Sequence, residues 1–239
     1  MSSLAPDLSG VPAVRSCLAE VLPHPGGGSV AALAALRNLA KPAALWSLLD
    51  AIQHDDEVAG QVAAASSRHV LGFDKFVLFA VRGGELRLHV WWPGELRRRE
   101  HIHDHRFRFA SVVLAGTLRN HMFQFAESGR PMVHHHEMST LADGTWRFEH
   151  AGQARIRECL VVELAPGGSY TMGVDLLHRV ETGPALTATL VLQEASLRTR
   201  SSVLLEPGAP APLPAMRTPF TLDQFRHKLA TLRRSLPSG

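Results

Sequence analysis

Apolar residues recur at the three- and four-residue spacing of helices from the N-terminus to about residue 72. The third of these stripes follows Pro42 and would bury Leu45, Leu48, Leu49 and Ile52 on one face. Four helices are expected, over residues 11–22, 29–40, from Pro42 onward, and from the capping residue Asp55 to about residue 70. Because this segment contains no chemical motif, its simplest interpretation is a helical cap on the next domain or on a partner.

The hydrophobic period changes to two over residues 73–205, which predicts strands. Glycines and prolines punctuate the pattern, and Gly83-Gly84 is a hairpin signal between the first two strands. The expected strands cover 76–81, 86–91, 107–115, 117–125, 132–139, 145–150, 155–164, 169–173, 177–181, 186–194 and 200–205. So many short strands with no helix between them indicate a mainly β sandwich or barrel rather than an α/β sheet.

A proline-rich stretch and a last helix close the chain. Residues 206–220 are expected to form an extended linker. A C-terminal helix is expected within 221–239, where Thr221 and Gln224 have the spacing of a capping box. Phe220 and Phe225 can form the hydrophobic staple beside it, and the helix would dock on the body or on a second subunit.

Composition narrows the class of protein. Of 239 residues 45% are apolar and 20% charged, which provides a sizeable core and argues against disorder. The sequence has no apolar run long enough for a membrane span and no evident secretory signal, and Cys17 and Cys159 do not suggest a disulfide framework. We therefore expect a cytoplasmic protein without a membrane partner. The net charge is +3, but the arginines are scattered, which argues against a nucleic-acid partner.

Histidines are concentrated in the β segment, since 8 of the 14 lie between positions 101 and 150. In His101-Ile102-His103-Asp104-His105, residues two apart share one face of a strand, and two of the three imidazoles can reach one metal ion. The third is too far away to join them. A further ligand must come from another strand, and His178 is the best candidate.

The β segment resembles the cupin superfamily, whose members are metal-binding jelly-roll barrels. With His103 and His105 as the HxH pair, Gly116 falls on the closing glycine of the first motif, and His178 matches the histidine of the second, preceded by Gly167. Phe109 stands where the family has a glutamate ligand. Gly173, Asp175 and Thr182 replace a proline, a glycine and an asparagine of the second motif. The resemblance implies a cupin-type barrel with His103, His105 and His178 as metal ligands, although His101 could take the place of His105.

The same resemblance implies a function. Three neutral histidines suit Fe(II), as in the thiol dioxygenases of the superfamily, while Zn, Mn, Ni and Cu are chemically suitable. Without a carboxylate ligand the ion keeps its full charge, which favours a small, anionic substrate. Tyr170, the single tyrosine, could act as a proton donor near the metal, with a packing role as the alternative. Cupins often form homodimers, and a homodimer is expected here.

Three classes of function stay open at this point. The first is an iron oxygenase acting on a small metabolite. The second is a non-redox metal enzyme, an isomerase, epimerase or hydrolase. The third is a non-catalytic module that binds a small ligand or a metal.

Several other polar residues have a simpler interpretation. His134-His135-His136 lies in an expected inserted hairpin over 127–150 and is interpreted as surface histidines, with an adventitious metal site as the alternative. His89 is expected to be a hydrogen-bonded structural residue, with a place in the lining of the barrel mouth as the alternative. Arg106 and Arg108 alternate with the histidines and should face away from the metal, unless a bulge intervenes. Arg119 and Arg179 could bind a substrate carboxylate, but nothing in the sequence favours either.

Overall fold

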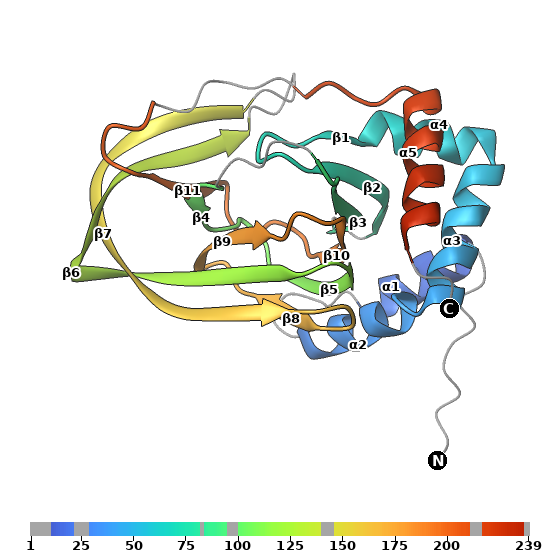
Figure 1. Ribbon diagram of the computed structural model, residues 1–239, viewed down its shortest axis with the longest axis horizontal. Coiled ribbons are helices and arrows are strands. Elements are labelled where there is room, and N and C mark those ends of the chain that lie inside the picture. Colours follow the sequence, from blue (N-terminus) through green and yellow to red (C-terminus); the bar gives the residue numbers. More distant parts are fainter. Residues whose placement is uncertain are drawn as a thin grey trace, which may run out of the picture.

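The computed structural model describes residues 11–21, 29–81, 84–94, 100–139, 146–210 and 217–236. Its body consists of two antiparallel sheets with helices packed on the outer side of the first (Figure 1). The first sheet has the order β1-β2-β3-β10-β5-β8, with β1 (Ser67–Arg68), β2 (Asp74–Val81), β3 (Gly84–Trp91), β10 (Thr187–Gln193), β5 (Phe109–Ala115) and β8 (Ser169–Met172). The second has the order β11-β4-β9-β6-β7, with β11 (Arg200–Leu205), β4 (Ile102–His103), β9 (Leu177–Thr182), β6 (Leu118–Ser139) and β7 (Trp146–Leu164).

The strand order is that of a jelly roll. From β3 to β10 successive strands lie in opposite sheets, except for the hairpin β6–β7, and the first and last strands of this series are neighbours. Two Greek keys wound in this way form the double-sheet barrel found in cupins. The mainly β fold with helical ends is therefore the one that the sequence predicts.

Strands β6 and β7 correct one expectation, because each joins two segments that were expected as separate strands. Residues 117–125 and 132–139 merge into β6, and 145–150 and 155–164 merge into β7. Phe125 and Arg130 both lie opposite Ile156, so the intervening residues form a bulge and the strand bends instead of ending.

The bend lets β6 pair with two other strands of the second sheet in addition to β7. Its first half pairs with β9 and its second half with β11, so the strands curl around a small apolar cluster. That cluster is separate from the main core and consists of Ile102, Phe123, Met132, Ile156, Leu177 and Leu204.

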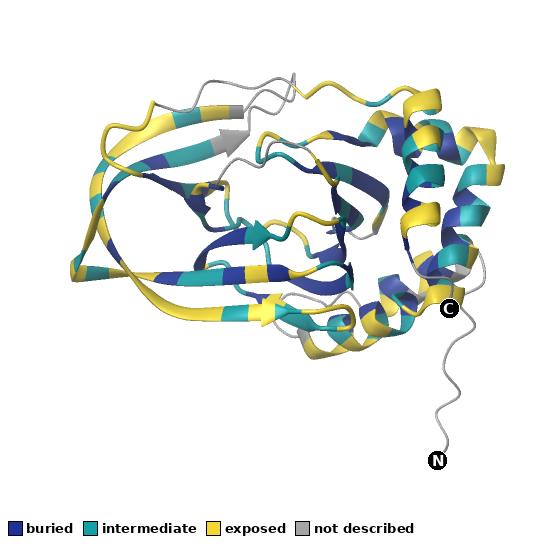
Figure 2. Cartoon of the chain, in the orientation of Figure 1, coloured by how far each residue is buried: buried dark blue, intermediate teal, exposed yellow. Residues whose placement is uncertain are grey.

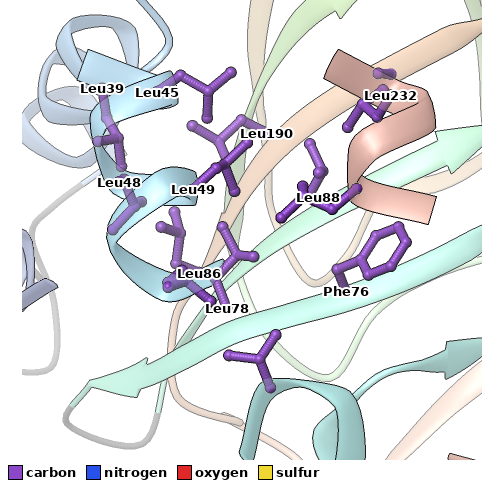
Figure 3. Packing of buried hydrophobic residues seen from close by; sticks show 14 of the residues in the cluster. Leu39, Leu45, Leu48, Leu49, Phe76, Leu78, Leu86, Leu88, Leu190 and Leu232 are labelled. Atoms are coloured by element: carbon purple, nitrogen blue, oxygen red, sulfur yellow. The ribbon is translucent and has the colours of Figure 1, made fainter. Parts of the chain in front are cut away.

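The main core lies between the helices and the first sheet (Figure 2). The helices are α1 (Val11–Val21), α2 (Ser29–Leu39), α3 (Pro42–His54) and α4 (Asp56–Ala65). In α3 the four residues expected on one face are buried, and they pack against leucines of β2, β3 and β10 (Figure 3). None of the described helices has the length and apolar character that a membrane span requires.

Helix α4 ends earlier than expected. Asp55 caps it through hydrogen bonds from Glu57 N and Val58 N, as predicted, but the helix stops at Ala65 instead of continuing to about residue 70. Ser66 turns the chain: its hydroxyl donates to Val62 O and accepts from Val77 N. The following two residues are then free to pair with β2.

Helix α5 (Leu222–Ser235) begins with the predicted capping box between Thr221 and Gln224. Phe220 and Phe225 both contact the ring of Phe76 on the first sheet. The buried carboxylate of Asp74 accepts from Lys228 at 2.7 Å, which ties α5 to the barrel. Part of the expected linker, 211–216, and the hairpin residue Gly83 lie outside the described residues. The end of the linker is docked on the body, since Pro219 bridges to Ser67.

Candidate metal centre

A cavity of about 780 Å³ lies between the two sheets. Strand alternation explains its lining: on β3 the side chains of Leu86 and Leu88 face the helices, whereas those of Arg87, His89 and Trp91 face the cavity. The second sheet contributes His103 and His178.

His103, His105 and His178 come together in the cavity wall, with ligand nitrogens within 4.8 Å of one another. His103 on β4 lies opposite His178 on β9, so these two are direct cross-strand neighbours. The three rings form a nearly equilateral triangle, with centroids 4.8, 4.9 and 5.0 Å apart. His101 is exposed and stands outside this cluster.

The geometry arises differently from the expected alternation along one strand. Strand β4 contains only Ile102 and His103, and His105 lies after its end. Asp104 holds this segment, because its carboxylate accepts from Ser202 N at 2.7 Å and pairs with Arg198 at 2.9 Å. The anchored turn brings His105 back toward His178.

Hydrogen bonds fix the tautomers of two of the three imidazoles. Nδ1 of His178 lies 3.0 Å from Asn120 Oδ1, and Nδ1 of His103 lies 2.9 Å from the carbonyl oxygen of His101. Oxygens of this kind accept hydrogen bonds, so each Nδ1 carries the hydrogen and each Nε2 presents a lone pair. Such outer partners are what orients histidine ligands in metal sites.

The residues present fit a divalent metal ion. Nε2 of His105 lies 2.8 Å from Nε2 of His178, and the latter nitrogen presents its lone pair toward the former. Two nitrogens bound at right angles to one ion at about 2.1 Å would be about 3 Å apart. Burial lowers the pKa of His105 and of His178 well below the usual range, and adjacent imidazoles lower each further. Both rings are thus held neutral, the form that binds metals.

Arg198 connects the two segments that carry the histidines. Its guanidinium donates to the carbonyl oxygen of His105 at 2.9 Å and also to that of Val174, and it pairs with Asp104. Val174 precedes β9 in the chain, so one side chain links the loop after β4 to the loop before β9.

Aromatic side chains surround the histidines. Phe109, at the family's glutamate position, has its ring centroid 4.9 Å from that of His105, and Phe107 lies 5.2 Å away. Tyr170 also lines the cavity, but its aromatic contact among the described residues is with Phe109, at 5.8 Å. Burial raises the pKa of the Tyr170 phenol far above its usual range.

For two other polar residues the preferred expectation is wrong, and for His89 the alternative is confirmed. His89 lines the cavity, and its buried Nε2 has no hydrogen-bond partner among the described residues, so it is not a hydrogen-bonded structural histidine. Arg106 also lines the cavity instead of facing away, because the chain leaves β4 before reaching it. Arg119 and Arg179 pair with glutamates and are absent from the lining.

The histidine run on β6 is only partly a surface feature. His134 and His136 share a face, with ring centroids 4.8 Å apart. His135 is buried, and its ring contacts that of His150 at 5.3 Å.

Sequence reasoning missed Asn120 and Arg198. Asn120 lies 58 positions from His178, and Arg198 lies 93 positions from His105. Neither belongs to a local motif. The apolar neighbours of Asn120 on β6 were the one available signal, since a buried asparagine requires a partner.

Comparison with known proteins gives little beyond the fold. No family model matches the sequence, and no curated protein matches it. Similar solved structures include a hydroquinone 1,2-dioxygenase from Sphingomonas sp. TTNP3 with 4-hydroxybenzoate bound, 10% identical over 51% of this chain and 65% of that chain, with a TM-score of 0.33. DMSP lyases are 14% identical over 61% of this chain and 53% of that chain (TM-score 0.31).

A Drosophila melanogaster CENP-C bound to CAL1 has a similar score, 0.35, with 10% identity over 58% of this chain and 90% of that chain. The chain thus spans less than two thirds of the length of the dioxygenase and of the lyases. These similarities do not select an activity.

Proposed function

We propose that this chain is a mononuclear non-haem iron oxygenase of a small molecule, with His103, His105 and His178 as the metal ligands. The observation that carries the proposal is the triangle of three imidazoles inside the cavity, two of them held in the tautomer whose Nε2 presents a lone pair. Bound Fe(II) would supply the redox chemistry with dioxygen that amino-acid side chains lack.

The residues around the triangle have distinct roles in this proposal. Asn120 and the carbonyl group of His101 keep two imidazoles in the metal-binding tautomer. Phe107 and Phe109 exclude water from the side of His105. Tyr170 keeps its phenolic proton because burial raises its pKa, so it is suited to donate a hydrogen bond or a proton and not to act as a base.

The acidic residues of the cavity favour redox chemistry over hydrolysis. Asp104 is held by Ser202 and Arg198, Glu100 accepts from Val180 N at 3.1 Å, and Glu137 accepts from Ser201 at 3.1 Å. A hydrolytic metal site needs a base within hydrogen-bond reach of the reacting water. Here these three carboxylates are already engaged, as is that of Glu85, which pairs with Arg87. Three histidines also suit zinc, so a non-redox Lewis-acid enzyme is the second candidate.

Metal analysis of variants tests the ligand assignment. Wild-type protein purified without oxygen and reconstituted with Fe(II) should retain about one ion per chain. Alanine at His103, His105 or His178 should abolish retention, whereas His101→Ala should keep it as the matched control. Retention in the His178→Ala variant, with circular dichroism unchanged, would refute the site.

Spectroscopy and oxygen uptake test the reaction class. Nitric oxide added to the Fe(II) protein should give the electron paramagnetic resonance signal of a spin-3/2 iron–nitrosyl species if an open position exists. Oxygen consumption with a panel of small carboxylic acids should depend on Fe(II) and be lost in the histidine variants. A protein that holds Zn but turns over substrate without consuming oxygen would instead support the Lewis-acid alternative.

A further inference from the structure

Three polar side chains form a patch on the cavity wall contributed by β2 and β3. Lys75 on β2 lies opposite His89 on β3, and Arg87, two residues before His89, is its diagonal neighbour on the same face. All three line the cavity, and the candidate metal centre does not use them.

Lys75 on β2 is a partly buried cation. Its ammonium makes no hydrogen bond and no ion pair with any residue in the described part of the chain. A buried charge is costly unless it is paired. Burial lowers its pKa to about 8, yet the group stays mostly charged at neutral pH.

The guanidinium of Arg87 lines the cavity, and the described residues engage only its Nε in hydrogen bonds. Nε donates to Glu85 at 2.6 Å, and no hydrogen bond of the two terminal nitrogens is found within the described residues. The guanidinium carbon lies 5.4 Å from the ring centroid of Phe107, which in turn contacts His105. A ligand bound to Arg87 would therefore extend along Phe107 toward the histidine triangle.

His89 adds a third unsatisfied group. Its Nε2 is buried and lacks a partner among the described residues, while its ring packs on Phe73 at 4.6 Å. Buried polar atoms without a partner are uncommon and call for an explanation such as a ligand.

We infer that Lys75, Arg87 and His89 form a subsite for the carboxylate of a small molecule whose apolar body lies on the aromatic wall. The end of the guanidinium matches the two oxygens of a carboxylate, and the ammonium supplies a second charged donor. The carboxylate subsite is argued independently of the metal. Only the idea that the end of the ligand opposite its carboxylate lies at the metal rests on the proposed function.

The charge around the subsite favours a single negative charge. Glu85 already takes up part of the Arg87 charge, and Glu137 lies in the same cavity. A doubly charged phosphate or phosphonate would meet more repulsion there than a carboxylate. Phe73, Trp91 and Phe107 provide flat apolar surface next to the cations.

Isothermal titration calorimetry at pH 7 tests the subsite with benzoate, phenylacetate and 3-phenylpropionate. Each acid is compared with its neutral amide, in the metal-reconstituted protein and after chelation. At least one acid should bind about tenfold more tightly than its amide. Lys75→Met and Arg87→Met should each remove most of that preference. Arg119→Met, which removes an arginine outside the cavity, should leave it unchanged, and Lys75→Arg should retain it.

Several outcomes would overturn the inference. These are equal affinity for acid and amide, an unchanged preference in both methionine variants, tighter binding of phenylphosphonate than of benzoate, or no binding of the three acids with Kd below about 10 mM. Acid preference in the chelated protein tests the subsite by itself. If the alanine variants of the three histidines still retain the metal while the acid preference persists, the proposed function is refuted but the subsite is not.

Discussion

Replacing Asn120 by leucine should weaken metal binding without unfolding the barrel. Asn120 is buried, and its Oδ1 is the oxygen within hydrogen-bond distance of Nδ1 of His178, at 3.0 Å. Leucine removes the acceptor and leaves a buried N–H without a partner, which costs about 1–3 kcal/mol. Loss of an outer partner of a metal-binding histidine typically lowers affinity about 10- to 100-fold, equivalent to about 1.4–2.7 kcal/mol. The first figure is a cost in folding stability, and the second is a loss of metal affinity.

Competition with a chromophoric chelator gives the affinity, with Zn(II) as an air-stable stand-in for iron. The matched variant is Asn120→Asp, which keeps an oxygen acceptor and should bind the ion at least as tightly as wild type. A leucine variant within about twofold of wild type would show that Asn120 does not orient His178. An aspartate variant as weak as the leucine variant would show that the position matters for packing alone.

Further predictions concern the fold and pH. Gly116→Ala should lower the free energy of unfolding by roughly 2 kcal/mol or more in chemical denaturation, because φ is +73° and an added Cβ would lie 2.3 Å from Leu186 O. Gly167→Ala is the control: φ is +84° but the space is open, so the loss should be only about 1 kcal/mol. Equal losses in the two variants would contradict the close approach at Gly116. Burial raises the pKa of Glu100 to about 8, so the folded chain keeps a proton that the unfolded chain releases from about pH 4.5 upward. Wild type should therefore lose stability relative to Glu100→Gln as pH rises from 5 to 8, and parallel melting-temperature profiles of the two metal-free proteins would refute this. Tyr170→Phe should keep the metal and lower turnover, and unchanged turnover would leave Tyr170 a packing residue.

The sequence pattern was sufficient to predict elements that depend on interactions between residues close together in the chain. The α3 face, the Asp55 cap and the Thr221 capping box follow from spacing within one or two turns. The pairing of positions 103 and 178 could be anticipated because a histidine repeat on a β-segment needs a ligand from another strand. The end of α4 was misplaced because Ser66 bonds to Val77, a contact with a different element.

Long-range contacts decided what the pattern left undetermined. Nothing near positions 126–131 shows that β6 continues through a bulge, because the pairing depends on Ile156 of β7. The position of His105 depends on Asp104, Ser202 and Arg198, which the sequence does not connect. The unpaired donors of Lys75 and Arg87 likewise depend on a cavity that strands far apart in the sequence form together.

Strand β4 has only two residues, yet it lies between β9 and β11 and carries one of the three histidines. An ion held by His103 and His178 would bridge β4 and β9, and any local opening of either strand would release it. Ligand present at about 100 times its Kd adds about 2.7 kcal/mol to the free energy of such an opening. Amide hydrogen exchange at Ile102 and His103 should then slow roughly 100-fold on metal loading, which would make the shortest strand of the second sheet a local reporter of occupancy.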